Sequence, residues 1–421
     1  MDLRILLANT SAFPQIGGVE NSLGYIAREL HALGHKVQVF CLQLGVDEPL
    51  HVVHEQVEYV RAPSVRSRWP HTRLWNYVAA VEQAAPAVIE AFRPNVVWSR
   101  SASVALGIRR GGYSGPLVQV FCTNARMDSG GTYLQTHGLP LHRRLLLLGL
   151  WPLAYRAAVQ VERELAPQCT SVAFSEHMRR ELLADFPSEA QRCHVIPPGV
   201  DDAFFSPERG RAGFNRLSEE FGLRVGDPTV LYVGRLSTAK HLTVLVDAFA
   251  ALDGSAKLVF VGSGPEEGRL KARAKALGVA DRVVFAGTQR ELLPAFYAAA
   301  RVFVLPTTTE SFGQVYLEAL ACGTPAVGFG GNGRDVLTAT DEIVRHGETG
   351  AVARPATAAA LAEEIGAVLS LDDAAYGSMS RRARADVRTR YSWRRFVERA
   401  LSVSGPPTDV MTEVCEAPCL R

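Results

Sequence analysis

The chain has 421 residues, which is more than one hydrophobic core usually supports, so we expect two domains. Hydrophobic residues make up 47% of the chain and charged residues 21%, a balance that excludes a disordered protein. Lysine and arginine number 45 against 43 acidic residues, and the net charge of +2 argues against a nucleic-acid-binding protein. The seven cysteines form no CxxC pair, which favours a reducing cytoplasm over a disulfide framework.

The most apolar run, residues 145–155 (LLLLGLWPLAY), is about half as long as a membrane-spanning helix, and Pro152 interrupts it. The preceding Arg143 and Arg144 would suit a basic amphipathic helix on a membrane surface. A buried helix is the commoner outcome for such a run, so membrane contact is not favoured. The apolar stretch at residues 1–8 is too short for a signal peptide, and a cytoplasmic protein is expected.

Short apolar strands alternate with helical segments along the first half of the chain, which is typical of a parallel α/β sheet. The expected helices include residues 20–33, ended by Gly34, and residues 179–185, ended by Pro187. The expected strands are residues 4–8, 36–42, 57–61, 95–98, 117–122, 171–174 and 194–196.

A Pro-Pro-Gly segment at 197–199 and a polar stretch at 206–218 break this alternation, and we place a domain boundary there. Residues 1–205 and 206–385 would then form two Rossmann-like, doubly wound domains, with a cleft at the carboxyl ends of both sheets. Residues 404–421, rich in Pro and Cys, are expected to form a flexible tail. The strands expected in the second domain are 229–233, 257–261, 282–285, 302–305 and 326–329, and its helices are 239–252, 266–277, 290–300, 313–321 and 357–369.

Two glycine-containing turns are suited to binding an anion. Gly17 and Gly18 lie just before the first helix, where backbone N–H groups and the helix dipole favour a phosphate, although an ordinary tight turn would look the same. Gly234 follows a strand and precedes Arg235 and Lys240, two cations that could hold one phosphate. A solvated helix cap is the alternative interpretation of this second pair.

No cofactor and no metal site are expected. The glycines at 262, 264 and 268 imitate a dinucleotide fingerprint, but Pro265 follows the second one and no convincing acidic residue ends the next strand. The sequence also contains no Asp-x-Asp pair of the kind that holds a metal.

The segment from Glu310 to Glu318 is the most informative one. Glu310 is expected in a loop at the carboxyl edge of the sheet, and Gly313 opens a helix whose free N–H groups point to that edge. Glu318 falls one to two turns inside this helix, so the two carboxylates could contact one elongated ligand at two points. Carboxylates accept hydrogen bonds from the neighbouring hydroxyls of a sugar or a ribose. A bracing role for Glu318 within its helix is the structural alternative.

Together these motifs resemble those of the retaining glycosyltransferases of family 4, which have the GT-B fold. The resemblance implies that a last helix, residues 386–403, crosses back onto the first domain. The matching segments follow the family's order from residue 3 to about 400: Gly17-Gly18, Pro198-Gly199-Val200-Asp201, Gly234-Arg235 with Lys240, Glu310 with Glu318, 317–325 (LEALACGTP), 342–350 (EIVRHGETG) and Tyr391-Ser392-Trp393.

Carried onto this chain, the resemblance implies that Arg235, Lys240 and Glu310 are the catalytic residues. Arg235 and Lys240 would hold the donor diphosphate, with Gly17 and Gly18 closing on it from the other domain. Two fixed cations and a helix N-terminus can stabilise the leaving diphosphate without a metal. In a front-face mechanism the departing phosphate takes the proton of the acceptor, so Glu310 is not expected to be a nucleophile.

The resemblance also assigns the rest of the donor site. Glu318 would bind the ribose of the nucleotide, and Arg290 would lie near the base. The group that holds hydroxyls of the transferred sugar would be Glu310, Ser311, Phe312 and Gly313.

One position departs from the family pattern, because many members have a histidine where this sequence has Cys122. Thr123, Asn124 or His137 could replace the hydrogen bonds of that histidine, and the thiol is expected to be structural, since free cysteine is mostly a small buried hydrophobe. The residues expected to bind the acceptor are Asn9, Glu20, Arg100, Cys122, Thr123, Asn124, Arg126, Asp128 and Tyr133.

Residues 7–11 (LANTS), 15–22 (QIGGVENS) and 121–123 (FCT) resemble enzymes of the aminoglycoside pathway that attach N-acetylglucosamine to 2-deoxystreptamine. The leading interpretation is therefore transfer of N-acetylglucosamine from UDP-N-acetylglucosamine to a small hydrophilic acceptor. A polycationic acceptor would require carboxylates in its site, whereas a lipid phosphate would require a basic, apolar helix. Two alternatives remain open: transfer to a lipid-linked glycan or inositol lipid at the membrane, and a UDP-sugar epimerase or hydrolase with the GT-B fold.

Overall fold

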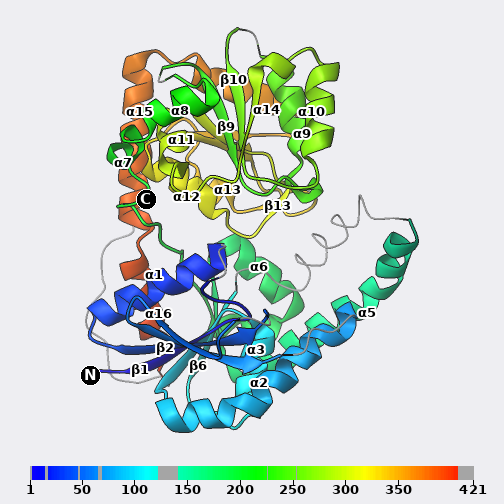
Figure 1. Cartoon of the computed structure of the whole chain (residues 1–421), viewed down its shortest axis with the longest axis vertical. Helices are drawn as coiled ribbons and strands as arrows, with labels where there is room; N and C mark the ends of the chain where they lie inside the picture. Colours follow the sequence, from blue (N-terminus) through cyan, green and yellow to red (C-terminus); the bar gives the residue numbers. More distant parts are fainter. Residues whose placement is uncertain are drawn as a thin grey trace.

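In the computed structural model the chain forms two α/β lobes, one above the other, as Figure 1 shows. The structure describes residues 2–14, 18–45, 48–64, 69–121, 141–224, 226–252 and 254–405. Within these ranges no helix is both long and apolar enough to cross a membrane.

The first lobe is built on an eight-stranded sheet in the order β3-β4-β2-β1-β5-β6-β7-β8. All neighbouring pairs are parallel except β3 and β4, which are antiparallel. The strands are β1 (Arg4–Ala8), β2 (Lys36–Gln43), β3 (His51–His54), β4 (Val57–Pro63), β5 (Val96–Ser99), β6 (Leu117–Phe121), β7 (Thr170–Ala173) and β8 (Cys193–Val195). The helices are α1 (Gly18–Ala32), α2 (Pro70–Phe92), α3 (Ala102–Arg110), α5 (Leu141–Leu165) and α6 (Glu176–Asp185).

Helices cover both faces of this sheet, which explains why its central strands β1, β5 and β6 are apolar at most positions. Successive residues of a strand point to opposite faces. Accordingly, Leu6 and Ala8 of β1 pack in the cluster that α2 and α3 complete, while Ile5 and Leu7 pack in the cluster that includes residues of α1 and of the last helix.

The second lobe contains a six-stranded, fully parallel sheet in the order β11-β10-β9-β12-β14-β16. Its strands are β9 (Thr229–Val233), β10 (Lys257–Val261), β11 (Val283–Gly287), β12 (Val302–Leu305), β14 (Ala326–Phe329) and β16 (Gly350–Ala353). A separate pair joins β13 (Thr309–Glu310) to β15 (Leu337–Thr338). The helices are α7 (Pro207–Arg211), α8 (Phe214–Phe221), α9 (Leu242–Ala250), α10 (Glu267–Ala276), α11 (Leu293–Ala299), α12 (Gln314–Ala321), α13 (Thr340–Ile343), α14 (Ala358–Leu369) and α15 (Asp373–Arg390).

The last helix, α16 (Trp393–Ser402), returns to the first lobe and contacts α1. Gly199 of the linker makes this crossing possible, because a Cβ at Gly199 would lie only 2.1 Å from the backbone nitrogen of Trp393. The position expected for the crossing, residue 386, lies inside α15, and the change of lobe occurs between α15 and α16.

Ser404, where a flexible tail was expected to begin, is buried, and its Oγ accepts a hydrogen bond of 2.8 Å from Trp98 Nε1. Residues 406–421 lie outside the described part of the chain.

Four strands escape the sequence pattern: β3, β16 and the paired strands β13 and β15, which have only two residues each and so leave no apolar run. Glu310, which was expected in a loop, is the last residue of β13. β3 is a short, antiparallel edge strand with histidine at both ends, so it has no apolar run. β16 (GAVA) consists of small residues and has only one β-branched side chain, although all four residues are buried.

Candidate active site

The loops that follow β9 and β10 lie against each other through their backbones. A Cβ at Gly262 would lie 2.0 Å from the carbonyl oxygen of Gly234, and Gly234 itself has a φ of +146°. Both positions therefore require glycine. Leu236 N donates to Ser263 O at 3.0 Å, which fixes the loop carrying Arg235 and Lys240 at the carboxyl edge of the sheet.

Lys240 and Glu310, which are 70 residues apart in the sequence, form an ion pair in this structure. Lys240 Nζ lies 2.7 Å from Glu310 Oε2, and the two side chains are 28% and 18% exposed. Sequence reasoning assigned the two residues to different parts of a donor but did not foresee that they contact each other. Each one neutralises the charge of its partner.

Arg235 is exposed, and its guanidinium makes no ion pair with any residue in the described ranges. It lies five positions before Lys240 on the same loop, so one side chain of the expected cationic pair is free and the other is held by Glu310. The loop that they share keeps both side chains near the carboxyl edge of the sheet in the second lobe.

The helix α12 begins immediately after a left-handed residue. Gly313, with a φ of +86°, allows the sharp turn, and Gln314 is the first helical residue. Phe312 is buried against Phe174 of the first lobe and Tyr391, with ring centroids 6.1 and 5.9 Å away. The segment from Ser311 to Gly313 therefore lies at the junction of the two lobes, with the N–H groups of the first turn of α12 next to it.

Glu318 lies on α12 one turn after its start. Tyr297 Oη donates a hydrogen bond of 2.8 Å to Glu318 Oε2, and burial raises the pKa of Glu318 to about 7. Surrounding protein atoms exclude water from much of this carboxylate, yet Glu318 also lines a cavity.

That cavity, of about 190 Å³, lies between the lobes. Arg290, Gln314 and Glu318 contribute from the second lobe, and Tyr25 of α1 and Trp393 of α16 line it from the other side. The Gln314 Nε2 is buried and donates no hydrogen bond to any described residue. A ligand with an acceptor oxygen would satisfy this donor.

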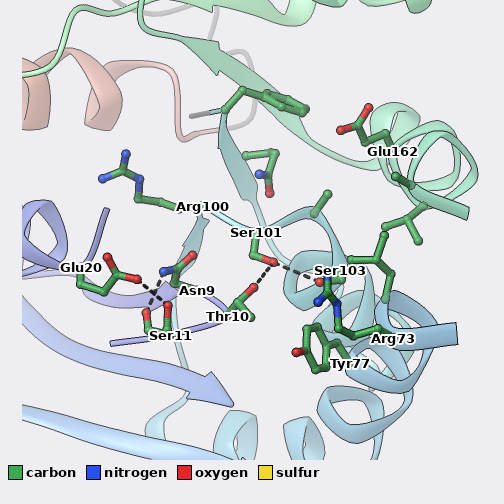
Figure 2. A pocket seen from close by; sticks show the side chains of 16 residues that line it. Asn9, Thr10, Ser11, Glu20, Arg73, Tyr77, Arg100, Ser101, Ser103 and Glu162 are labelled. Carbon is green, nitrogen blue, oxygen red and sulfur yellow. Dashed lines mark hydrogen bonds between the residues drawn. The ribbon is translucent and has the colours of Figure 1, made fainter. Parts of the chain in front are cut away.

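A larger pocket, of about 410 Å³, occupies the first lobe at the carboxyl ends of β1, β5 and β6 (Figure 2). Hydroxyl groups form its floor: Thr10 Oγ1 donates to Ser101 Oγ at 2.7 Å, and Ser101 Oγ lies 3.1 Å from Ser103 Oγ. Glu20 accepts a hydrogen bond of 2.5 Å from Ser11 Oγ, which orients its carboxylate at one side of the pocket.

The structure brings three of the expected acceptor residues together in this pocket: Asn9, Glu20 and Arg100. The Arg100 guanidinium lies over the ring of Phe174, 5.2 Å from its centroid. The remaining expected acceptor residues lie outside the described part of the chain, namely Cys122, Thr123, Asn124, Arg126, Asp128 and Tyr133. Gly17, expected at the donor, and His137 also lie outside it. Gly18 is the first residue of α1.

Besides the hydroxyl residues Thr10, Ser11, Ser101 and Ser103, sequence reasoning missed four further polar residues of the pocket: Arg73, Tyr77, Gln119 and Glu162. Gln119 had a detectable signal, because it is the only polar residue of β6 (LVQVF). Its side chain is 1% exposed, and its Oε1 is buried without a hydrogen-bond partner in the described ranges. The other three come from α2 and α5, and no local pattern distinguishes them from ordinary surface residues of a helix.

Comparisons with known proteins agree with this architecture. Residues 16–204 match the family model Glycosyltransferase Family 4, and residues 214–386 match Glycosyl transferases group 1. The D-inositol 3-phosphate glycosyltransferase of Acidothermus cellulolyticus is 37% identical over 238 residues, which cover 53% of this chain and 50% of that protein. The alpha-monoglucosyldiacylglycerol synthase of Streptococcus pneumoniae is 26% identical over 78% of this chain and 71% of its own length.

Among solved structures, sucrose-phosphate synthase from Thermosynechococcus elongatus superposes with a TM-score of 0.76 at 21% identity, covering 95% of this chain and 98% of its own. The chain spans about half the length of the inositol-phosphate relative that it matches. The two family matches are consecutive and coincide with the two lobes. The chain therefore belongs to the group 1 and family 4 glycosyltransferases, and its two Rossmann-like domains form the GT-B fold.

Proposed function

We propose that this protein is a retaining, metal-independent glycosyltransferase that moves N-acetylglucosamine from UDP-N-acetylglucosamine to a small hydrophilic acceptor, with 2-deoxystreptamine as the first acceptor to test. The observation that carries the proposal is the group at the lobe junction. Lys240, Arg235 and the start of α12 provide positive potential, and Glu310 and Glu318 provide two separate carboxylates along the same edge.

Donor binding then exchanges one ion pair for two contacts. The diphosphate takes the place of Glu310 at Lys240 Nζ, and Arg235 lies on the same loop to contact the second phosphate. Glu310, once released, accepts hydrogen bonds from hydroxyls of the sugar. Glu318 accepts hydrogen bonds from the ribose, and Arg290 lies in the same cavity on the side of the base.

The bond between the anomeric carbon and the diphosphate oxygen breaks, and a bond from the same carbon to an acceptor oxygen forms on the same face. The acceptor proton moves to the departing phosphate oxygen, so the products are the glycoside and UDP. Negative charge builds on the diphosphate as its bond breaks, and fixed cations that contact it lower the barrier.

The pocket of the first lobe supports a small polar acceptor. It combines hydroxyls, amides and the carboxylates of Glu20 and Glu162, and its volume of about 410 Å³ is enough for a compact ring. Carboxylates are the groups that an acceptor with amino substituents requires.

A lipid-linked acceptor is the second candidate, and one observation favours it. The helix α5 extends to the side of the first lobe (Figure 1), and its Leu153 is 46% exposed next to the stacked rings of Trp151 and Tyr155. An apolar side chain on a projecting helix is suited to contact with a bilayer surface.

Mass spectrometry of the products from a panel of UDP-sugars, each combined with aminocyclitol and lipid acceptors, tests the proposal. We expect an aminocyclitol product that carries one N-acetylhexosamine, and Lys240→Ala should abolish most of it, whereas Lys275→Ala, an exposed lysine of α10, should not. Consumption of UDP-N-acetylglucosamine without any acceptor would indicate an epimerase or hydrolase, and a product only with lipid acceptors would indicate the second candidate.

A further inference from the structure

The N-terminus of α6 in the first lobe is held by a carboxylate from the second lobe. Glu176 N and His177 N, the first two amides of α6, donate to Glu342 Oε2 and Oε1, each at 2.7 Å. These amides have no partner within their own helix, and a helix N-terminus attracts a negative charge. A bidentate, charge-assisted contact of this kind is stronger than one between neutral groups.

Glu342 also binds the segment where the chain returns to the first lobe. Its carbonyl oxygen accepts a hydrogen bond of 3.1 Å from Tyr391 Oη and a second hydrogen bond from the Arg390 guanidinium. Arg390 in turn pairs with Asp386 at 2.8 Å. One residue therefore connects α6, the second lobe and the junction of α15 and α16.

The residue that caps α6 contacts the loop 310–313, which we propose binds the donor. Ser175 Oγ accepts from Met178 N at 3.0 Å, as a helix cap does, and also donates to Ser311 O at 3.1 Å. The neighbouring Phe174 packs edge-on against Phe312. Ser311 follows Glu310 directly, so the first lobe contacts the backbone of the segment that we propose holds the sugar. In Figure 1, α6 lies directly below α12 and α13.

We infer that Glu342 is a positioning residue for glycosyl transfer: its carboxylate keeps α6 docked on the second lobe, and α6 through Ser175 and Phe174 keeps the loop 310–313 in its working geometry. This inference rests on the proposed function of that loop. Glu342 itself touches neither the cavity beside Glu318 nor the Lys240–Glu310 pair. Its loss should therefore act on the geometry of the reaction rather than on contact with the donor.

The test compares Glu342→Ala and Glu342→Gln with Glu348→Ala. Glu348 is a suitable control because it is near in sequence, its side chain is 59% exposed, and it pairs with Arg345 only at 3.7 Å. We expect Glu342→Ala to lower kcat by about tenfold, the effect of losing ~1.4 kcal/mol from the docked state, while the donor KM changes by less than about twofold. Glu342→Gln, which keeps one acceptor oxygen, should lie between Glu342→Ala and the wild type.

Small-angle X-ray scattering supplies a readout that does not depend on turnover. Glu342→Ala should be more expanded than the wild type and Glu348→Ala, both with and without saturating UDP. A variant that melts at a lower temperature but keeps its kcat and its compact profile would overturn the inference, because Glu342 would then only stabilise α6. A wild-type protein that neither binds UDP nor consumes any UDP-sugar would overturn the proposed function instead, and the scattering comparison would still decide whether Glu342 docks the lobes.

Discussion

The two lobes hold their polar groups in different ways. In the second lobe, Arg235 and Lys240 lie on a loop fixed by glycine at a strand end, and Lys240 is paired with Glu310, whereas Arg235 makes no ion pair in the described ranges. In the first lobe, the pocket is lined by hydroxyls, amides and charges from strands and from α2 and α5. The second lobe therefore presents a compact electrostatic site, and the first a distributed hydrogen-bonding site.

This difference assigns donor binding to the second lobe and acceptor selectivity to the first. A site made of fixed charges is suited to a diphosphate, which every sugar nucleotide shares. A site made of many hydrogen-bonding groups from several elements is suited to discriminating one polar ring from another, because an unmatched buried group costs free energy. If this division is correct, substitutions in the second lobe should lower turnover with every acceptor, and those in the first lobe should change which acceptor is used.

The largest effect is expected for Lys240→Ala. It removes a cation whose contact with the diphosphate strengthens as charge develops, so kcat should fall about 100-fold with every acceptor tested. Steady-state kinetics of UDP release measures this, with Lys275→Ala as the matched lysine control. Near-normal turnover in Lys240→Ala would refute the role of this lysine.

Glu318→Gln should weaken UDP binding about tenfold at pH 8, because a charged acceptor of hydrogen bonds is lost. Burial raises the pKa of Glu318 to about 7, so the wild-type protein should bind UDP less well as the pH falls below 7, while the variant should not. Isothermal titration calorimetry between pH 5.5 and 8.5 measures both effects. Equal pH dependence in the two proteins would contradict the assignment.

The same substitution should stabilise the folded protein. Because the folded-state pKa of about 7 lies above the ordinary value of 4.5, the folded protein binds the Glu318 proton more tightly than the unfolded chain does. The free energy of unfolding of the wild type therefore falls as the pH rises from 4.5 through 7. Glu318→Gln removes this cost, so it should be more stable by up to about 3 kcal/mol at pH 8 and similar to the wild type at pH 4.5. Urea unfolding at both pH values checks the sign.

In the first lobe, Gln119→Leu should raise the acceptor KM several-fold and leave the donor KM unchanged. The buried Oε1 of Gln119 has no partner within the described ranges and faces the pocket lining, so a hydrogen-bond donor on the acceptor would satisfy it. Leucine has a similar shape and needs no partner, and the stability of the protein should not fall. A change in the donor KM would show that Gln119 affects donor binding, and it would contradict the assignment of acceptor selectivity to the first lobe.

The smallest effect is expected for Cys122→Ser, which should keep most of the activity. The family resemblance implies that Cys122 stands where many members have histidine, and we expect its thiol to be structural. A hydroxyl of nearly the same size can replace a structural thiol, but it would be a much weaker nucleophile than a catalytic one. Complete loss of activity, measured with the acceptor that the wild type uses, would show that the thiol takes part in the reaction.

The sequence predicted best what is locally encoded. The strands 229–233, 257–261, 302–305 and 326–329 match β9, β10, β12 and β14 residue for residue, because each is a buried apolar run bounded by glycine, proline or charged residues. The proposed donor segment, residues 310–318, was visible for the same reason, since Gly313 and the two glutamates lie within nine residues of one another. The strand order and the partners of the charges depend on contacts distant in sequence.

Three features could not be predicted from local sequence patterns. The ion pair between Lys240 and Glu310 joins residues brought together only by the order of the strands in the sheet. Arg73 and Glu162 reach the pocket from helices that are themselves positioned by packing. Glu342 was visible as part of a family-like segment, but its contact with α6 spans 166 residues and the two lobes.

A crystal structure with UDP tests the central claim most directly. The account predicts that the diphosphate lies between Arg235 and Lys240, that Glu310 has left Lys240, and that the ribose hydroxyls contact Glu318. UDP bound anywhere else, with the Lys240–Glu310 pair undisturbed, would contradict it.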